Sequence, residues 1–324
     1  MVKYFQILLG VLISLVSGYY AFHDVAWEKV SAAFSRIEVI GLLPALVMLA
    51  LFLLLRAYRW QAFIAPVQAV RLRSFWSATM IGFMANDLLP LRAGELVRAY
   101  ALAHLASLRM STAVATTVLE RVWDAVAVAI ILVATLSGIP LPSWLQRANY
   151  VLLGLCASVL VGGWLLARQG EAVFSRFSPR VAALARSFAS GFTVLQSVPQ
   201  LLFVLFLSLL IWLTWGGFYW VLLRACGFSL PLQATFVVLI FTVFASAIPA
   251  APGYFGTYQV AMELALQLYN IPKDDALGFS LVAHATQYFP VVIVGLIEMF
   301  RARLPLWPSQ LVKAEAEGVS PPVT

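Results

Sequence analysis

Two short stretches decide the fold of this chain: LPLRAG at residues 89–94 and APGYFG at residues 251–256. The first lies in the middle of an apolar region over residues 74–107, and the second in the middle of an apolar region over residues 233–269. Proline removes a backbone hydrogen bond and glycine weakens a helix, so each region predicts two short helices joined by a break. We refer to these regions as the first hairpin and the second hairpin.

The two breaks match each other at one fixed distance along the chain. Pro252 lies 162 positions after Pro90, and Gly256 lies 162 positions after Gly94. Such a match indicates an internal duplication, as in secondary transporters whose broken helices meet near the middle of the membrane. The alternative is a chance recurrence of proline and glycine in apolar sequence.

The sequence around the hairpins has the composition of a membrane protein. Hydrophobic residues make up 62% of the 324 positions and charged residues 11%, whereas soluble domains average about 45–50% and about 25%. Plain apolar blocks long enough to cross a bilayer lie at about residues 4–22, 39–55, 113–138, 149–167, 200–223 and 277–300. Each hairpin therefore has a span before and after it, and the two predicted repeats cover about residues 38–138 and 200–300.

The charges between the apolar blocks predict the topology. Residues 56–73 contain Arg56, Arg59, Arg71 and Arg73 without an acidic residue. Residues 168–199 are basic and amphipathic, so both segments are expected on the cytoplasmic side. Residues 23–38 and 270–276 carry an excess of acidic residues and are expected outside. The first hairpin then enters the membrane from the inside and the second from the outside, which is an inverted-topology repeat.

The predicted fold class is an all-α polytopic membrane protein with about six full spans and two re-entrant helical hairpins. Residues 1–308 form one membrane domain, and residues 309–324 form a short polar tail. The chain is expected in the cytoplasmic membrane with both termini in the cytoplasm. The first apolar block is expected to remain as a span, because the bulky residues after Ser17 offer no signal-peptide cleavage site.

Charged residues within membrane segments are costly, so each one is a candidate site residue. The first hairpin contains Asn86, Asp87, Arg92, Glu95 and Arg98 beside its break. A helix that restarts there points its positive end into the break, and arginine binds phosphate in two places at once. This cluster therefore predicts a binding site for an anion such as phosphate. The alternative is that Arg92 and Asp87 pair with each other and cap the hairpin.

The span that follows the first hairpin carries a second charged cluster. Glu120, Arg121 and Asp124 lie on adjacent faces of one helix, because residues three and four apart are neighbours there. Three charges cannot face lipid, so we expect them to face the interior and meet the first hairpin. A structural ion network and a direct role in binding substrate both fit this pattern.

A third set of candidates lies in and after the second hairpin: Tyr254, Thr257, Gln259, Glu263 and His284. For two of these residues, the sequence allows two roles each. His284 relays protons or acts as an ordinary buried hydrogen-bonding group, and Glu263 carries a coupling proton or lies near the outer interface.

Other classes of site have no motif in this sequence. We find no phosphate-binding loop for a nucleotide, no set of metal ligands and no nucleophile elbow, so no cofactor, metal or direct use of ATP is expected. The net charge of +7 comes from arginine and lysine between apolar blocks, where it favours anionic lipid headgroups rather than nucleic acid.

Several stretches resemble the flippase-like integral membrane family, which includes the transmembrane region of lysylphosphatidylglycerol synthases. They are RAYRW at 56–60, NDLLPLRAGELVR at 86–98, LERVWD at 119–124 and the run from Pro249 to Gly256. The resemblance implies translocation of a lipid with an anionic or aminoacylated headgroup, bound near Arg92, Glu95, Arg98, Glu120 and Arg121. The synthases also carry a soluble aminoacyl-transferase domain that is not found here, so a stand-alone member is expected, with a polyprenyl-linked or other lipid as alternative cargo.

Three functional hypotheses follow from these patterns. The first is a lipid translocase that is not an enzyme and whose partners are membrane lipids. The second is a membrane-embedded enzyme that acts on lipid headgroups, with Glu120 or Asp124 as base and His284 as acid. The third is an accessory subunit of a lipid-modifying or glycosyl-transferring enzyme, which docks on the basic segment over residues 168–199.

Overall fold

The computed structural model describes residues 2–28, 30, 39–89, 93–136, 147, 150–151, 154–162, 164–165, 190, 192, 197–248 and 250–304. Every element in this part of the chain is a helix. The elements are α1 (Val2–Phe22), η1 (Val39–Gly41), α3 (Leu42–Ile64), α4 (Leu72–Leu88), α5 (Gly94–Ala106), α6 (Met110–Leu136), α9 (Val198–Ala225), α10 (Leu232–Ala247), η4 (Pro252–Tyr254), α11 (Thr257–Gln267) and α12 (Lys273–Arg301).

The prediction of an all-α polytopic membrane protein is confirmed. Within the described residues, α3, α9 and α12 are long and apolar enough to cross a membrane, and shorter apolar helices lie in α1 and α10. Helix α6 coincides with the span expected over residues 113–138. The expected span over residues 149–167 is described only in part, and the polar tail and most of residues 168–199 lie outside the described residues.

One predicted boundary is wrong. The span expected over residues 39–55 continues as α3 to Ile64, so Arg56 and Arg59 belong to a helix and not to a loop. Both side chains are buried, at 2% and 0% exposure. A helix can continue past buried arginines where carboxylates from another helix neutralise them, and Asp124 does so here. Of the other two arginines in the predicted loop, Arg71 lies just before α4 and Arg73 lies in its first turn.

Both hairpins are pairs of short helices, as predicted. Helix α4 ends at Leu88, where Leu89 is extended as expected for a residue before proline. Helix α5 begins at Gly94, and a Cβ atom added there would lie 2.2 Å from the carbonyl oxygen of Gly82. Glycine therefore allows α5 to pack directly on the backbone of α4. In the second hairpin, Gly253 and Gly256 have positive φ angles of 76° and 87° in the turn between α10 and α11.

The helices of the two halves correspond to each other along their whole length. A shift of 162 residues moves α5 to 256–268 and α6 to 272–298, which nearly coincide with α11 and α12. The first helices of the two repeats, α3 and α9, pack side by side and run antiparallel. Arg59 Nη1 donates to Ser208 Oγ at 2.8 Å, and the ring of Phe52 lies 4.5 Å from that of Trp215. Antiparallel equivalent helices are what an inverted-topology duplication requires.

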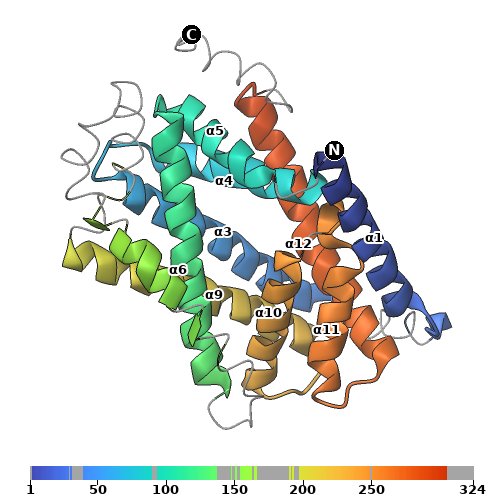
Figure 1. The fold of residues 1–324 in the computed structure, drawn as a ribbon. Coiled ribbons are helices and arrows are strands. Elements are labelled where there is room, and N and C mark those ends of the chain that lie inside the picture. Colours follow the sequence, from blue (N-terminus) through green and yellow to red (C-terminus); the bar gives the residue numbers. More distant parts are fainter. Residues whose placement is uncertain are drawn as a thin grey trace.

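Each hairpin also packs against the last helix of the other repeat. Helix α4 lies against α12, and α10 lies against α6 (Figure 1). The two hairpins therefore occupy opposite ends of a bundle whose centre is the α3–α9 pair. The apolar core follows this arrangement, since one cluster around Leu222, Val238 and Phe279 joins the repeats in the middle.

Helix α1 lies outside the repeats and covers the second hairpin. The N–H of Ala251 donates to Ser14 Oγ at 2.7 Å, and a Cβ atom on Gly256 would lie 2.6 Å from the backbone of Ser14 and Gly18. At the far end of α1, Lys273 Nζ donates to the carbonyl oxygen of Tyr20 at 2.6 Å. The start of α1 and the end of α12 lie at the same end of the bundle as the first hairpin (Figure 1).

Candidate functional site

A cavity of about 210 Å³ lies between the two repeats. Aromatic and aliphatic side chains such as Phe52, Phe83 and Trp215 form part of its wall. Its polar residues come from both halves of the chain: Arg56, Asn86, Asp87, Glu95 and Arg121 from the first repeat, and Thr242, Ser246, Tyr254, Thr257 and Gln287 from the second. The cavity is therefore polar on one part of its wall and apolar on the rest, as a site for an amphipathic molecule would be.

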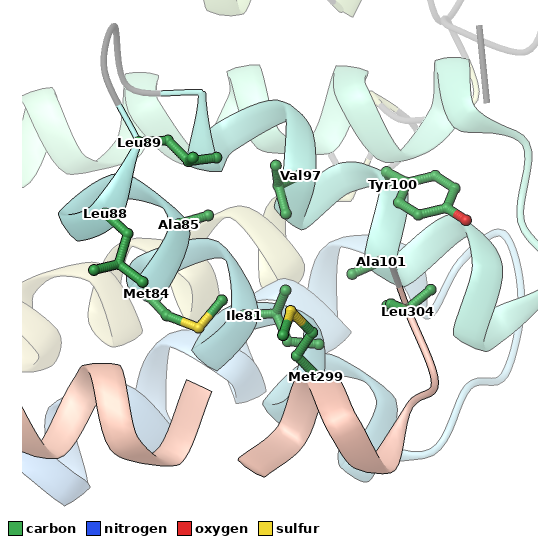
Figure 2. Close-up of a pocket in the computed structure, with 10 residues that line it drawn as sticks. All are labelled: Ile81, Met84, Ala85, Leu88, Leu89, Val97, Tyr100, Ala101, Met299 and Leu304. Atoms are coloured by element: carbon green, nitrogen blue, oxygen red, sulfur yellow. The ribbon is translucent and has the colours of Figure 1, made fainter. Parts of the chain in front are cut away.

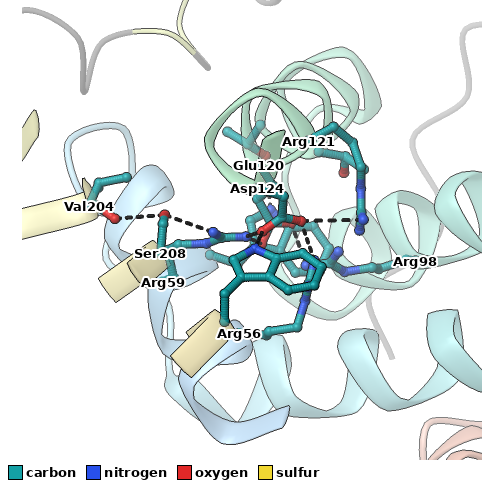
Figure 3. A network of polar contacts seen from close by, with 12 residues as sticks. Arg56, Arg59, Arg98, Glu120, Arg121, Asp124, Val204 and Ser208 are labelled. Carbon is teal, nitrogen blue, oxygen red and sulfur yellow. Dashed lines mark hydrogen bonds and ion pairs between the residues drawn. The ribbon is translucent and has the colours of Figure 1, made fainter. Parts of the chain in front are cut away.

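Asp124 of α6 is the centre of an ion network beside this cavity (Figure 3). Arg56 Nη2 lies 2.7 Å from Asp124 Oδ2, and Arg59 Nη2 lies 2.7 Å from Asp124 Oδ1. The indole N–H of Trp212 donates to Asp124 Oδ1 at 3.2 Å. These contacts tie α3, α6 and α9 together, so Asp124 joins the first repeat to the second.

Glu120 lies one turn before Asp124 and forms an ion pair with another arginine, Arg98. Arg98 Nη2 donates to Glu120 Oε2, and both side chains are almost fully buried. The Arg98 guanidinium also lies 4.0 Å from the centre of the Trp60 ring, a cation–π contact. A Cβ atom on Gly82 would lie 2.4 Å from Cβ of Arg98, so a glycine in α4 makes room for the arginine. Arg98 and Glu120 thus hold α5 against α6, behind the cavity wall.

Arg121 is the most exposed arginine of this group, and it lines the cavity together with Arg56. Its side chain is 44% exposed, and its Nη2 lies 2.9 Å from Glu95 Oε1. Its Nη1 lies 3.3 Å from Asp124 Oδ2. Asn86 Nδ2 donates to the same Glu95 oxygen at 3.4 Å. The carboxylate of Glu95, in the first turn of α5, is therefore held by side chains of α4 and α6.

The charges of this network do not cancel. The members are Arg56, Arg59, Glu95, Arg98, Glu120, Arg121 and Asp124. Four guanidinium groups face three carboxylates, which leaves one positive charge in excess. The Nε atoms of Arg56, Arg59 and Arg98 also have no hydrogen-bond partner in the part of the chain that the structure describes. The network can therefore accept one more anionic group.

Of the candidate residues in and after the second hairpin, some line the cavity and the others hold the helices behind it. Tyr254 and Thr257 line the cavity, whereas Gln259, Glu263 and His284 do not. Gln259 Oε1 accepts the N–H of Gly256 at 2.8 Å, and Gln259 Nε2 lies 3.1 Å from His284 Nδ1. Gln259 therefore holds the start of α11 and joins it to α12.

His284 and Glu263 each occupy a supporting position. The His284 ring lies between Phe255 and Tyr258, with centroid distances of 4.7 and 4.6 Å. Glu263 lies 4.0 Å from Lys273 Nζ, at the end of the bundle opposite the first hairpin. Within the described residues, no hydrogen bond or ion pair joins His284 to Glu120 or Asp124, the acid and the bases considered for an enzyme.

Some predicted site residues cannot be placed, and some site residues were not predicted. Arg92 and the basic segment that would dock a partner enzyme lie outside the described residues. Arg56 and Arg59 were assigned to a loop, although their spacing of three residues after an apolar block fits one face of a continuing helix. Trp212 and Tyr219 gave no signal, because aromatic residues in an apolar span do not reveal which face is buried.

A second, smaller cavity lies between α4, α5 and the end of α12 (Figure 2). Its volume is about 30 Å³, and its lining is almost entirely apolar, with Met84, Val97 and Met299 among the side chains. This space is too small for a lipid headgroup, and none of the charged residues of the network lines it. The cavity between the repeats is therefore the candidate site.

Comparisons with known proteins place most of the chain in one family of membrane domains. Residues 7–295 match the sequence profile of the lysylphosphatidylglycerol synthase transmembrane region. A relative described as a UPF0104 membrane protein, from Methanocaldococcus jannaschii, is 26% identical over 227 residues, which are 66% of this chain and 92% of the relative. No solved structure matches the chain. The residues matched to the profile include both hairpins and the whole ion network.

Proposed function

The chain belongs to the family of the lysylphosphatidylglycerol synthase transmembrane region, and from this premise we propose that it moves a lipid with a phosphate-bearing, anionic headgroup between the two leaflets of the cytoplasmic membrane. The cargo is an anionic phospholipid or a polyprenyl phosphate, and an aminoacylated phospholipid, whose phosphate is anionic although its ammonium groups offset that charge, is the alternative. No chemical step accompanies the movement, and both termini of the protein lie in the cytoplasm.

The observation that carries this proposal is the position of the cavity between two antiparallel repeats. A site at such an interface opens to one leaflet or the other when one repeat rocks against its partner. Arg121 and Arg56 supply guanidinium groups at the wall, where a phosphate meets the excess positive charge of the network. Arg98, which the sequence favoured as a phosphate ligand, supports the network through Glu120.

The amphipathic wall explains how one molecule is both held and released. The headgroup occupies the polar part beside Arg121, Tyr254 and Thr257, while the acyl chains stay in the surrounding lipid. Helix α11 begins at Thr257, so its positive end faces the same space as the arginines. The phosphate thus exchanges its water shell for fixed donors from both repeats.

Reconstitution of the protein into vesicles tests this proposal. The probe is a fluorescent phosphatidylglycerol whose transfer between leaflets is followed by chemical quenching from outside. Wild-type protein is expected to speed transfer over protein-free vesicles, and Arg121→Gln to slow it at least about tenfold, because a charge-assisted hydrogen bond to phosphate contributes about 1.5–3 kcal/mol. Arg301→Gln is the matched control, since Arg301 is 65% exposed at the end of α12.

Two results would contradict the proposal. One is transfer no faster than in protein-free vesicles. The other is equal slowing by Arg121→Gln and Arg301→Gln, which would show that a general loss of positive charge, and not the cavity, causes the effect.

A further inference from the structure

Asp87 is a cavity residue that the ion network leaves unused. It lines the same cavity as Arg56, Glu95 and Arg121. Within the described residues, its carboxyl group takes part in no hydrogen bond and no ion pair. Its side chain is partly buried, in a hairpin that the proposed function places within the membrane. An ionised carboxylate without a partner is costly in this setting, whereas a protonated one is not.

Within the described residues, no guanidinium group forms an ion pair with Asp87. The titratable groups near it from the elements packed against α4 are Arg56 of α3, Glu95 of α5, Tyr254 of η4 and Tyr288 of α12, with Arg121 of α6 on the same cavity wall. The two arginines are already held, Arg56 by Asp124 at 2.7 Å and Arg121 by Glu95 at 2.9 Å. The tyrosines are neutral. Arg92, in the break of the same hairpin, lies outside the described residues.

We propose that Asp87 binds one proton together with the anionic headgroup, so that movement of the lipid is coupled to movement of a proton. The inference rests on the proposed function. With Asp87 ionised, four guanidinium groups face four carboxylates and the site is neutral. With Asp87 protonated, the site carries one positive charge, which matches the single negative charge of a phosphodiester. The proton comes from water, binds a carboxyl oxygen of Asp87 and leaves with the lipid.

The coupling has a definite sign. Because binding of the proton favours binding of the anion, binding of the anion favours binding of the proton by the same factor. Affinity for the anionic lipid is therefore high at low pH and falls as the pH rises and Asp87 loses its proton. Glu263 and His284, the other residues considered for protons, do not line the cavity and cannot produce this effect directly.

The test measures binding of dihexanoyl phosphatidylglycerol to the purified full chain in detergent across about pH 5 to pH 9. This probe is a phosphodiester and has no ionisation near about pH 6, unlike a phosphomonoester. Wild-type affinity is expected to fall about tenfold across the range, the effect of one unit charge within a partly buried site. Asp87→Asn is expected to bind the lipid equally well at every pH, with the affinity that wild type has at low pH. Glu263→Gln is the matched control and should keep the wild-type profile.

A second measurement needs no variant. Calorimetry of wild type in buffers of different ionisation enthalpy reports the protons taken up with each lipid, and about half a proton per lipid is expected near the midpoint of the profile, the largest uptake that goes with a tenfold change in affinity. Binding that is independent of pH and takes up no proton would overturn the coupling and leave the proposed function standing. Equal pH profiles of wild type and Asp87→Asn would show that another residue binds the proton, and would also overturn the proposed role of Asp87. No binding at any pH would overturn the proposed function, and the coupling with it.

Discussion

The two hairpins share one framework and differ in the chemistry that they carry. A shift of 162 residues relates their helices, yet no charged residue of the ion network has a charged counterpart at the shifted position. The corresponding pairs are Arg56 and Phe218, Arg59 and Val221, Glu95 and Thr257, Arg98 and Val260, Glu120 and Val282, Arg121 and Ala283, and Asp124 and Thr286. The duplication kept the helix packing in both halves, while the charges of the site belong to one half.

Neutral groups replace the ion network in the second half. Tyr219, Thr242 and Tyr258 join α9, α10 and α11 through their hydroxyl groups, at 3.1 and 3.2 Å. Gln259 and His284 join α11 to α12. These contacts carry no net charge, so they hold the helices together without attracting an ion. The difference predicts that disruption of the first half costs more stability than disruption of the second, and that the headgroup is held mainly by the first.

The largest effect is expected where the first hairpin closes. In Gly94→Ala, the new Cβ would lie 2.2 Å from Gly82 O and 2.5 Å from Asn86 N, and backbone atoms cannot move aside without opening the hairpin. We expect a loss of about 5 kcal/mol in the free energy of unfolding, or no folded protein, which is the upper range for overpacking. The measurement is unfolding in mixed detergent micelles.

Gly154→Ala is the control for this substitution, because nothing lies within 4 Å of a Cβ atom there. A similar loss of stability in both variants would mean that the space around Gly94 does not limit the hairpin.

The next effect tests the ion network against its neutral counterpart. Asp124→Asn leaves Arg56 and Arg59 buried with one partner fewer, and removal of one member of a buried ion pair costs about 3–5 kcal/mol. Thr286→Ala, at the corresponding position of the second repeat, removes a hydroxyl group that donates to Val282 O within its own helix. That change is expected to cost less than about 1 kcal/mol. Unfolding of the two variants in parallel measures the difference.

Equal losses in Asp124→Asn and Thr286→Ala would contradict the division of labour between the repeats. A small loss in both would show that the arginines find water or lipid phosphate as a substitute partner.

Much of this fold could be predicted because proline, glycine and apolar length act locally. In both breaks a proline followed within four residues by a glycine marks the end of a helix, whereas Pro290, without such a glycine, lies inside α12. Blocks of about 20 apolar residues have few alternatives to a membrane span. The end of α3 was missed for a different reason. Whether a helix continues through Arg56 and Arg59 depends on Asp124, which is more than sixty residues away in the sequence. A local pattern contains no information about such a partner.

The site was predictable in its residue types and not in its geometry. Asn86, Asp87, Glu95 and Arg121 were identified because charges are rare within membrane segments, and the cavity brings them together. The sequence does not show that Arg121 lines the cavity while Arg98 does not, because the two differ in the neighbours that α4 and α6 supply. Gly82 leaves room for Arg98 to reach Glu120, and this contact removes Arg98 from the wall.

The smallest loss of stability is expected in the second repeat, where the contacts between helices are hydrogen bonds between neutral groups. Tyr219→Phe removes the hydroxyl group that contacts both Thr242 and Tyr258, with no change in ring packing. Because these are hydrogen bonds between neutral groups, the expected loss is about 0.5–1.5 kcal/mol in the free energy of unfolding. Tyr58→Phe serves as the control, since the Tyr58 side chain is exposed on α3 and its hydroxyl has no partner within the described residues.

A loss of stability in Tyr219→Phe as large as that in Asp124→Asn would show that the hydroxyl cluster, and not charge, dominates the stability of the interface. The expected ratio of about four to one between Asp124→Asn and Tyr219→Phe instead follows from the cost of leaving buried charges unpaired, which neutral groups do not incur.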